Sequence, residues 1–135
     1  MTMATFHLQI VTPDRMAFDG EAEKIIVRTV NGDVCILSHH IDYAAPLGIG
    51  EAKVTDAEGK TRSAACNGGL ISVQDNEVRV MAITFEWEDD IDLERAHRAE
   101  AEAQEKLQAM SKEDQNFAIA EAKLKRALTR IHVKG

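Results

Sequence analysis

The chain changes character at about Glu86. Before this residue, short apolar stretches alternate with turn residues, as they do in β-proteins. From Glu86 to Val133 there is no glycine and no proline, and apolar residues recur at steps of three and four, as in amphipathic helices. The two patterns bury their apolar residues in different ways. The sequence therefore predicts an α+β chain built from two units, residues 1–86 and residues 91–135.

The first unit carries the period-two alternation that is typical of half-buried strands, for example at residues 6–11. Turn residues interrupt it at positions 18–20, 31–32, 56–59 and 67–69. The Asn31-Gly32 pair is the strongest hairpin signal, because both residues tolerate the positive φ angles of a tight turn. Many short strands with no helical stretch between them favour an antiparallel β-sandwich or a flattened barrel.

The second unit contains two apolar stripes with helical spacing. The first comprises Ala96, Ala99, Ala103, Leu107 and Met110, and the second comprises Phe117, Ala120, Leu124, Leu128 and Ile131. Ser111 followed by Asp114 resembles a capping box and predicts that the second helix begins there. We expect an antiparallel α-helical hairpin. Its alanine-rich faces bury little area, so at about 25 cal/mol per Å² their docking is worth only a few kcal/mol.

The link between the two stripes, at residues 110–112, contains no helix breaker. One continuous helix from Leu93 to Val133 is therefore an alternative to the hairpin. At about 1.5 Å per residue that helix would be roughly 60 Å long. A weakly docked hairpin that can straighten has the physical properties of a switch.

Composition limits the partners. The net charge of −7 argues against nucleic acid as the main ligand, because phosphate binding requires a basic surface. Cys35 and Cys66 lie in separate apolar stretches and are predicted to be buried, reduced thiols. The chain has no signal-peptide pattern and no apolar run of about 20 residues. We expect an intracellular chain that associates with a membrane only as part of a complex.

The sequence gives little support for a metal site or for catalysis. His39 and His40 are adjacent, so on a strand they would point to opposite faces, and no third ligand has a useful spacing. The acidic run at 88–92 lacks the glycine and the terminal glutamate of a calcium loop, and charge at a helix start explains it better. No constellation of catalytic residues is present. The prediction is a protein that is not an enzyme, with no metal and no required cofactor.

One cluster of charges has a candidate function. Arg126 and Arg130 lie four residues apart on one helical face, and in an antiparallel hairpin they return toward Asp92 and Arg95 at the start of the first helix. Three guanidinium groups near a helix N-terminus can hold a polyphosphate. The alternative is a solvated basic face, with Asp92 acting only as an N-cap.

Four segments occur in an order that resembles one family. They are FHLQIVTP at 6–13, NGD at 31–33, NGGLISV at 67–73 and IDLERA at 91–96. Together they are similar to the epsilon subunit of bacterial F-type ATP synthases, over nearly the whole chain. The resemblance implies a sandwich of about ten strands that packs on the gamma subunit and touches the membrane rotor ring. It also implies that the helices, when extended, reach the alpha and beta subunits and oppose ATP hydrolysis.

The resemblance also implies roles for particular residues. An ATP-binding motif of the family, I-D-x-x-R-A with arginines on the second helix, matches Ile91, Asp92, Arg95, Ala96, Arg126 and Arg130. The inhibitory contact would be made by Lys123, Lys125, Arg126 and Arg130. Contact with the rotor ring would be made by Asp33, His40 and Ile41. Some ATP-binding members carry a further arginine on each helix, where this chain has Glu102 and Ile119.

The expected function follows from this resemblance. The chain would be the central-stalk epsilon subunit of a proton- or sodium-translocating ATP synthase, peripheral on the cytoplasmic side of the cell membrane. It would couple rotation and inhibit ATP hydrolysis, with ATP as a regulatory ligand. The alternative is a free-standing ATP-binding regulatory module, which would need the helical site but not the sandwich loops.

Overall fold

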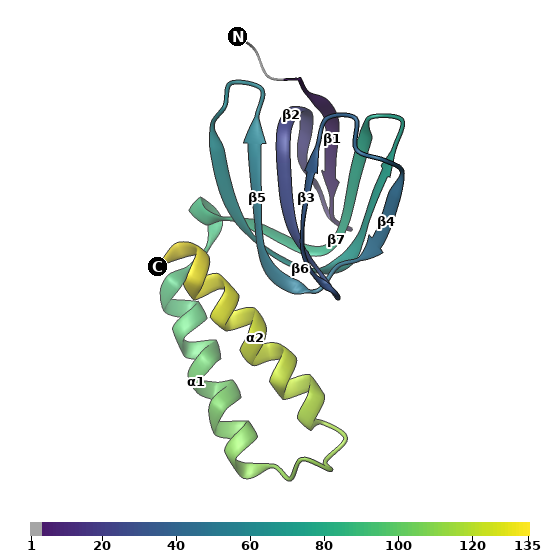
Figure 1. The fold of residues 1–135 in the computed structure, drawn as a ribbon. Coiled ribbons are helices and arrows are strands. Elements are labelled where there is room, and N and C mark those ends of the chain that lie inside the picture. The colour runs from purple at the N-terminus through teal and green to yellow at the C-terminus, as the bar shows by residue number, and fades with distance from the viewer. Residues whose placement is uncertain (1–3) are drawn as a thin grey trace.

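The computed structural model describes residues 4–135, which form a β-sandwich with a helical hairpin projecting from one end (Figure 1). The strands are β1 (Phe6–Val11), β2 (Met16–Thr29), β3 (Gly32–Leu37), β4 (Tyr43–Pro46), β5 (Ile49–Asp56), β6 (Thr61–Gln74) and β7 (Glu77–Trp87). The helices are a 3-10 turn (Glu88–Asp90), α1 (Leu93–Ala109) and α2 (Phe117–Lys134). The predicted α+β class is confirmed, and the hairpin is folded rather than straightened.

The strands close into a flattened ring. β1 pairs with β7, and the order continues through β6, β5 and β2, which pairs with β1 again, while β3 extends from β2 and β4 pairs with β6. The sheet is mixed, because β1 and β7 run parallel. Five strands that alternate in direction cannot close into a ring without one parallel junction. The sheet therefore departs from the purely antiparallel prediction at this one pairing.

Two long strands, β2 and β6, account for part of the difference between the seven strands of the structure and the roughly ten that were expected. The predicted break at 18–20 lies within β2, whose first half pairs with β1 and whose second half pairs with β3. The predicted turn at 67–69 lies within β6. There the chain bends at Gly68 and Gly69, which have positive φ angles, and continues alongside β7. The glycines in β6 bend the strand without ending it.

The core of the sandwich is aliphatic. Its fully buried large side chains are Phe6, Leu8, Ile10, Ile25, Val27, Ile36, Val54, Ile71 and Val80. Trp87 closes one end, where its indole N–H donates to the Ala17 carbonyl at 3.1 Å and its ring packs edge-on against Phe85. The sandwich thus includes Trp87, one residue beyond the predicted limit at 86.

The two cysteines differ in their surroundings. Cys66 is buried, and burial raises its pKa to about 12, so its thiol stays protonated. Cys35 is exposed, and the prediction that it is buried was wrong. Successive residues of β3 point to opposite faces of the sheet, and Cys35 lies with Asp33 and Leu37 on the face that is turned to solvent, whereas Ile36 points into the core.

The helical hairpin is held together by small residues, Ala96 and Ala103 on α1 and Ala120 and Ala127 on α2, all of which are buried. The predicted stripe on α2 was partly wrong, because Leu128 is 44% exposed. The α2 helix also begins at Phe117 rather than at Ser111. The Ser111 hydroxyl accepts the N–H of Glu113, and Asp114 accepts that of Asn116, so two turns take up the chain before the helix.

The hairpin meets the sandwich through a limited contact. Ala65 of β6, Ile91 before α1 and Val133 at the end of α2 form a separate small apolar cluster. α2 lies against β5 and β6, and the C-terminus ends beside the junction (Figure 1). Within residues 4–135, no helix is long and apolar enough to span a bilayer.

Candidate functional site

The site begins at the N-terminus of α1. Asp92 is the N-cap residue, and its side chain accepts the backbone N–H of Arg95 at 3.1 Å. Ile91 is buried with Ala65 and Val133. Part of the I-D-x-x-R-A motif therefore has a structural role, since Ile91 anchors the helix start and Asp92 caps it. Arg95 makes no ion pair among the described residues, so its guanidinium is available to a ligand.

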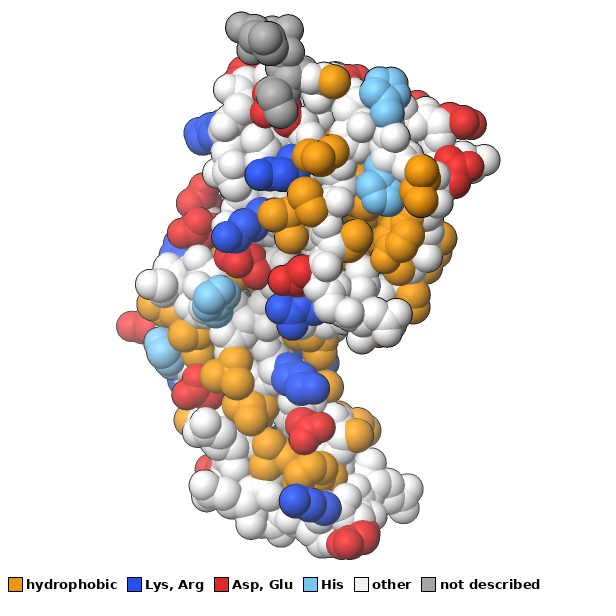
Figure 2. Space-filling view, viewed as in Figure 1, with side chains coloured by type: hydrophobic (Ala, Val, Ile, Leu, Met, Phe, Trp, Pro, Cys, Tyr) orange, Lys and Arg blue, Asp and Glu red, His pale blue; other side chains and the backbone are white. Residues whose placement is uncertain are grey.

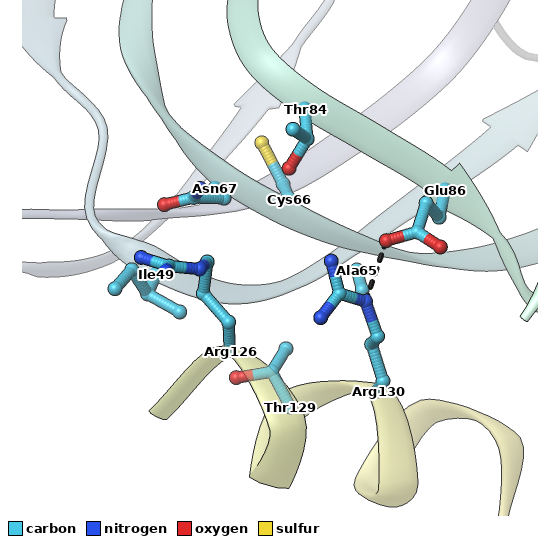
Figure 3. Close-up of a pocket in the computed structure, with 9 residues that line it drawn as sticks. All are labelled: Ile49, Ala65, Cys66, Asn67, Thr84, Glu86, Arg126, Thr129 and Arg130. Atoms are coloured by element: carbon cyan, nitrogen blue, oxygen red, sulfur yellow. Dashed lines mark hydrogen bonds and ion pairs between the residues drawn. The ribbon is translucent and has the colours of Figure 1, made fainter. Parts of the chain in front are cut away.

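Arg130 connects α2 to the sandwich. Its Nε donates to Oε1 of Glu86, on β7, at 2.6 Å (Figure 3). The two side chains are 28% and 31% exposed, so water screens the pair only partly. In Figure 3, Arg126 extends from the same helix toward Ile49 of β5, across a crevice with room for about one water molecule. The crevice is a packing contact and has no space for a ligand.

Two adjoining hollows lie between the helices. The first, of about 270 Å³, is lined by Glu86, Asp90, Asp92, Arg95, Ala96, Ala99 and Arg130. The second, of about 150 Å³, is lined by Ala99, Glu102, Ala103, Lys106, Lys123, Arg126 and Arg130. They share Ala99 and Arg130, so they are adjacent, and we call the two together the interhelical groove. It brings together every predicted ATP-binding residue except Ile91.

The two ends of the interhelical groove differ in charge. The first hollow has three carboxylates, of Glu86, Asp90 and Asp92, against two guanidinium groups. The second has four cations, Lys106, Lys123, Arg126 and Arg130, against the single carboxylate of Glu102. Carboxylates accept hydrogen bonds from hydroxyl or amino groups, whereas clustered cations attract phosphates. The groove thus has the chemistry to hold a ligand with a polar neutral end and an anionic end.

Glu86, Asp90 and Lys106 line the groove and were not predicted. The sequence carries a signal for Lys106, which follows Arg95 by eleven residues, close to three helical turns, and so lies on the same face of α1. No comparable signal exists for Glu86. It reaches the groove only because β7 ends where the hairpin docks.

The residues predicted to make the inhibitory contact are divided in the folded hairpin. Lys123, Arg126 and Arg130 line the second hollow. Lys125 is exposed and lies outside it. In the folded state, three of the four cations line the second hollow, and Lys123 is exposed to solvent there.

The residues predicted to touch the rotor ring lie at the two ends of β3. Asp33 is near its start and forms an ion pair with Arg28, which holds the pKa of the Asp33 carboxyl below its usual range. His40 and Ile41 follow the far end, where the His40 ring packs edge-on against Tyr43 and Ile41 is 80% exposed. A strand of six residues spans roughly 20 Å, so these residues form two separate surfaces. No cluster of metal-ligating side chains occurs in residues 4–135.

Comparison with known proteins agrees with this architecture. The beta-sandwich domain of the ATP synthase delta/epsilon chain matches residues 5–88, and the long alpha-helix domain of the same chain matches residues 89–135. The sequence is 40% identical over 132 residues to the ATP synthase epsilon chain of Ruminococcus albus. This alignment covers 97% of both chains. The sequence is also 37% identical over 134 residues to the ATP synthase epsilon chain of Halalkalibacterium halodurans. This alignment covers 98% of this chain and 99% of the relative.

Two solved structures share the fold. One is a chain of the Euglena gracilis mitochondrial ATP synthase, with a TM-score of 0.82 and 23% identity, covering 96% of this chain and 81% of that one. The other belongs to the central stalk and c-ring of the Tetrahymena thermophila mitochondrial ATP synthase, with a TM-score of 0.63 and 13% identity over all of both chains. With both domains matched in order and relatives aligned end to end, the chain belongs to the ATP synthase delta/epsilon chain family, as an epsilon subunit, which is a non-catalytic component of the F-type complex.

Proposed function

We propose that this epsilon subunit couples rotation in the central stalk of a proton- or sodium-translocating ATP synthase and restrains ATP hydrolysis through a hairpin that ATP keeps folded. The observation that carries the proposal is the contrast between the two units. The sandwich has an extensive buried core of its own, whereas the hairpin shares with it only a cluster of three buried apolar residues, a narrow crevice and the ion pairs Glu86–Arg130 and Glu51–His132.

This contrast makes a hinged movement energetically feasible. Separation of the hairpin from the sandwich exposes the small cluster of Ala65, Ile91 and Val133, opens the narrow crevice at Arg126 and Thr129, and breaks the Glu86–Arg130 and Glu51–His132 pairs. At about 25 cal/mol per Å², so small a cluster stabilises docking by a few kcal/mol at most. A partner or ligand of ordinary affinity can shift an equilibrium of that size.

The surface of the sandwich offers a docking site for the gamma subunit. Leu70 of β6 lies between Pro46 of β4 and Met81 of β7, and Ile83 points outward two residues after Met81. All four side chains are exposed. Hydrophobic side chains also gather over the β4 side of the sandwich in Figure 2. An exposed apolar row across three strands is typical of a protein–protein interface.

Further contacts complete the proposed place in the complex. Ile41 and His40 would touch the membrane rotor ring at one end of β3, so the subunit is peripheral to the membrane, on its cytoplasmic side, and joined to it only through the complex. When extended, α2 would present Lys123, Lys125, Arg126 and Arg130 to the alpha and beta subunits. In the folded hairpin, three of these cations line the interhelical groove, where ATP would hold them.

The test is hydrolysis by the assembled complex. Replacement of the four cations by alanine should raise ATP hydrolysis while assembly with gamma is unchanged. The matched control is K123R/K125R/R126K/R130K, which keeps every charge and should keep the inhibition. Unchanged hydrolysis in the alanine variant, starting from an inhibited complex, would refute the inhibitory role. ATP binding by a chain that fails to associate with gamma would instead favour a free-standing ATP-binding module.

A further inference from the structure

The turn between β6 and β7 is formed by two residues with unusual backbone angles. Asp75 and Asn76 lie between the paired residues Gln74 and Glu77, and their φ angles are +52° and +61°. Two-residue hairpin turns favour positive φ angles at both positions, and asparagine adopts such angles more readily than most residues. The turn thus accounts for the backbone of Asn76, but not for the contacts of its side chain.

The side chain of Asn76 bridges two other segments of the sandwich. Its Nδ2 donates to the carbonyl of Thr5, directly before β1, at 3.1 Å. Its Oδ1 accepts the backbone N–H of His39 at 2.7 Å, in the loop of residues 38–42 that follows β3. The Ser38 hydroxyl lies 3.0 Å from the same Thr5 carbonyl and 3.4 Å from Oδ1 of Asn76. We call these four residues the Asn76 clamp, because they join three parts of the chain at one point.

The clamp fixes the start of the loop. His39 has a φ angle of +62°, which few residues with a side chain adopt, and the hydrogen bond from its N–H to Asn76 stabilises this conformation. Next along, the N–H of His40 donates to the Leu37 carbonyl at 3.2 Å, and the His40 ring packs edge-on against Tyr43. The loop is therefore held near its start by the clamp and near its end by Tyr43.

The loop presents one large apolar side chain to solvent. Ile41 is 80% exposed, more than any other large apolar side chain that is exposed in residues 4–135. Burial of such a side chain favours association, whereas ordering of a flexible loop on binding opposes it. A loop that is already held loses little further conformational entropy when a partner covers Ile41. The clamp thus lowers the entropic cost of docking at this end of the sandwich.

We infer that Asn76 is a positioning residue, which keeps the 38–42 loop preformed so that Ile41 can act as the anchor of a docking contact. The inference rests on the proposed contact of His40 and Ile41 with the rotor ring, and it adds a residue from a separate turn that holds this contact in shape. The same turn is tied to β1, since the carbonyl of Asn76 accepts the N–H of His7 at 3.3 Å. Force applied to the loop during rotation would therefore reach β1 and β7 directly.

The experiment compares Asn76→Gly with Asp75→Gly in the full-length chain. Glycine adopts positive φ angles readily, so both variants can keep the turn. Only Asn76→Gly removes the clamp, because Asp75 makes no side-chain hydrogen bond among those of residues 4–135. The first readout is hydrogen exchange of the His39 amide, which should be about fivefold faster in Asn76→Gly and unchanged in Asp75→Gly. Denaturant unfolding checks that the sandwich of each variant remains folded.

The second readout is binding of the gamma–epsilon complex to the rotor ring solubilised in detergent. Asn76→Gly should weaken this binding about fivefold, because the loop must then be ordered on docking. Asp75→Gly should bind as the wild type does. Ile41→Asp tests the contact itself and should weaken binding at least about tenfold, because a carboxylate replaces the apolar anchor.

The outcomes separate the inference from the proposed ring contact. Unchanged exchange of the His39 amide in Asn76→Gly overturns the clamp. Faster exchange with unchanged ring binding shows that the loop need not be preformed, and the positioning role then fails. An equal effect of Asp75→Gly on binding shows that the turn matters rather than the Asn76 side chain, which also overturns the inference. If Ile41→Asp binds the ring as the wild type does, the proposed contact itself is wrong, and the positioning role fails with it.

Discussion

At the scale of single residues, Gly69 is the position at which the backbone leaves least room. Its φ angle is +109°, and a Cβ atom there would lie 1.9 Å from the carbonyl oxygen of Met81. The neighbouring strand β7 is backbone at this point and cannot move aside as a flexible side chain can. The constraint comes from the pairing of β6 with β7, not from a turn.

We therefore expect Gly69→Ala to destabilise the sandwich by roughly 3 kcal/mol, measured by denaturant unfolding. Gly20→Ala is the matched control, because Gly20 also lies in a long strand but a Cβ there would make ordinary contacts at 3.8 Å. It should change stability by less than about 1 kcal/mol. Equal unfolding midpoints for the two variants would show that β6 can bend without glycine.

His7 gives the sandwich a pH-dependent contact. Its Nε2 lies 2.7 Å from Oδ1 of Asp19 on β2, and its Nδ1 lies 3.6 Å from Glu77 on β7. The hydrogen bond to Asp19, with the nearby charges, raises the His7 pKa above its ordinary value of 6.5. The folded chain binds this proton more tightly than the unfolded chain. The stabilisation is therefore complete below the ordinary value and is lost as the pH rises through the raised pKa.

The expected result is that His7→Gln lowers the free energy of unfolding by roughly 0.5 kcal/mol at about pH 5.5 and by almost nothing at about pH 8.5. The effect is small because solvent screens a pair that is about one-third to one-half exposed. The measurement is urea unfolding of both proteins across this range. A difference that stays constant with pH would mean that His7 contributes through packing alone.

At the scale of elements, the Glu86–Arg130 pair is the polar connection between β7 and α2. Charged side chains of both signs lie where the sandwich and the hairpin meet (Figure 2). High salt, like mutation of the pair, should therefore weaken the docking of the hairpin on the sandwich. In contrast, the side chains that are buried between α1 and α2 are mainly alanines, so this contact is mainly apolar.

A double-mutant cycle of Glu86→Gln and Arg130→Gln should give a coupling energy of about 1 kcal/mol. The measurement is hydrogen exchange of the α1 and α2 amides, with those of β1 and β7 as the internal control. Exchange in the helices should become faster while exchange in the strands does not change. The coupling should shrink at about 1 M salt. A cycle that closes with no coupling energy would show that the Glu86–Arg130 pair does not contribute to docking of the hairpin.

At the scale of the whole molecule, the sandwich should be able to fold without the hairpin. The core of the sandwich lies entirely within residues 6–87. Trp87 is its last member, and it also lies beneath the guanidinium of Arg62, which is 3.8 Å from the ring centroid. A chain that ends at Glu88 keeps all of these contacts and loses only the hairpin.

That shortened chain should fold cooperatively and lose no more than about 2 kcal/mol of stability. The measurement is denaturant unfolding followed by the fluorescence of Trp87 and by the β signal in circular dichroism. For comparison, Trp87→Ala in the full chain should lower the free energy of unfolding by about 3–5 kcal/mol. Loss of a cooperative transition on shortening would show that the hairpin is part of the same folding unit.

Much of the fold follows from local pattern. The alternation at residues 6–11 and the Asn31-Gly32 turn predict β1 and the β2–β3 hairpin, because alternation and turn chemistry act over a few residues. The stripes of the helical unit predict two helices, with errors at the start of α2 and at Leu128. Arg95, Arg126 and Arg130 were predicted to converge; Arg95 lines the first hollow and Arg126 the second, and Arg130 lines both, so their joint role in binding stays a prediction.

The sequence by itself thus determined the two units, their order and the basic face of α2, because these depend on periodicity along the chain. Only the tertiary structure decided which breaks are bends within long strands, since Gly69 owes its role to the backbone of β7. It also placed Glu86 against Arg130, although forty-four residues separate them. Such contacts depend on how two finished units dock, and no local pattern of apolar or charged residues encodes that geometry.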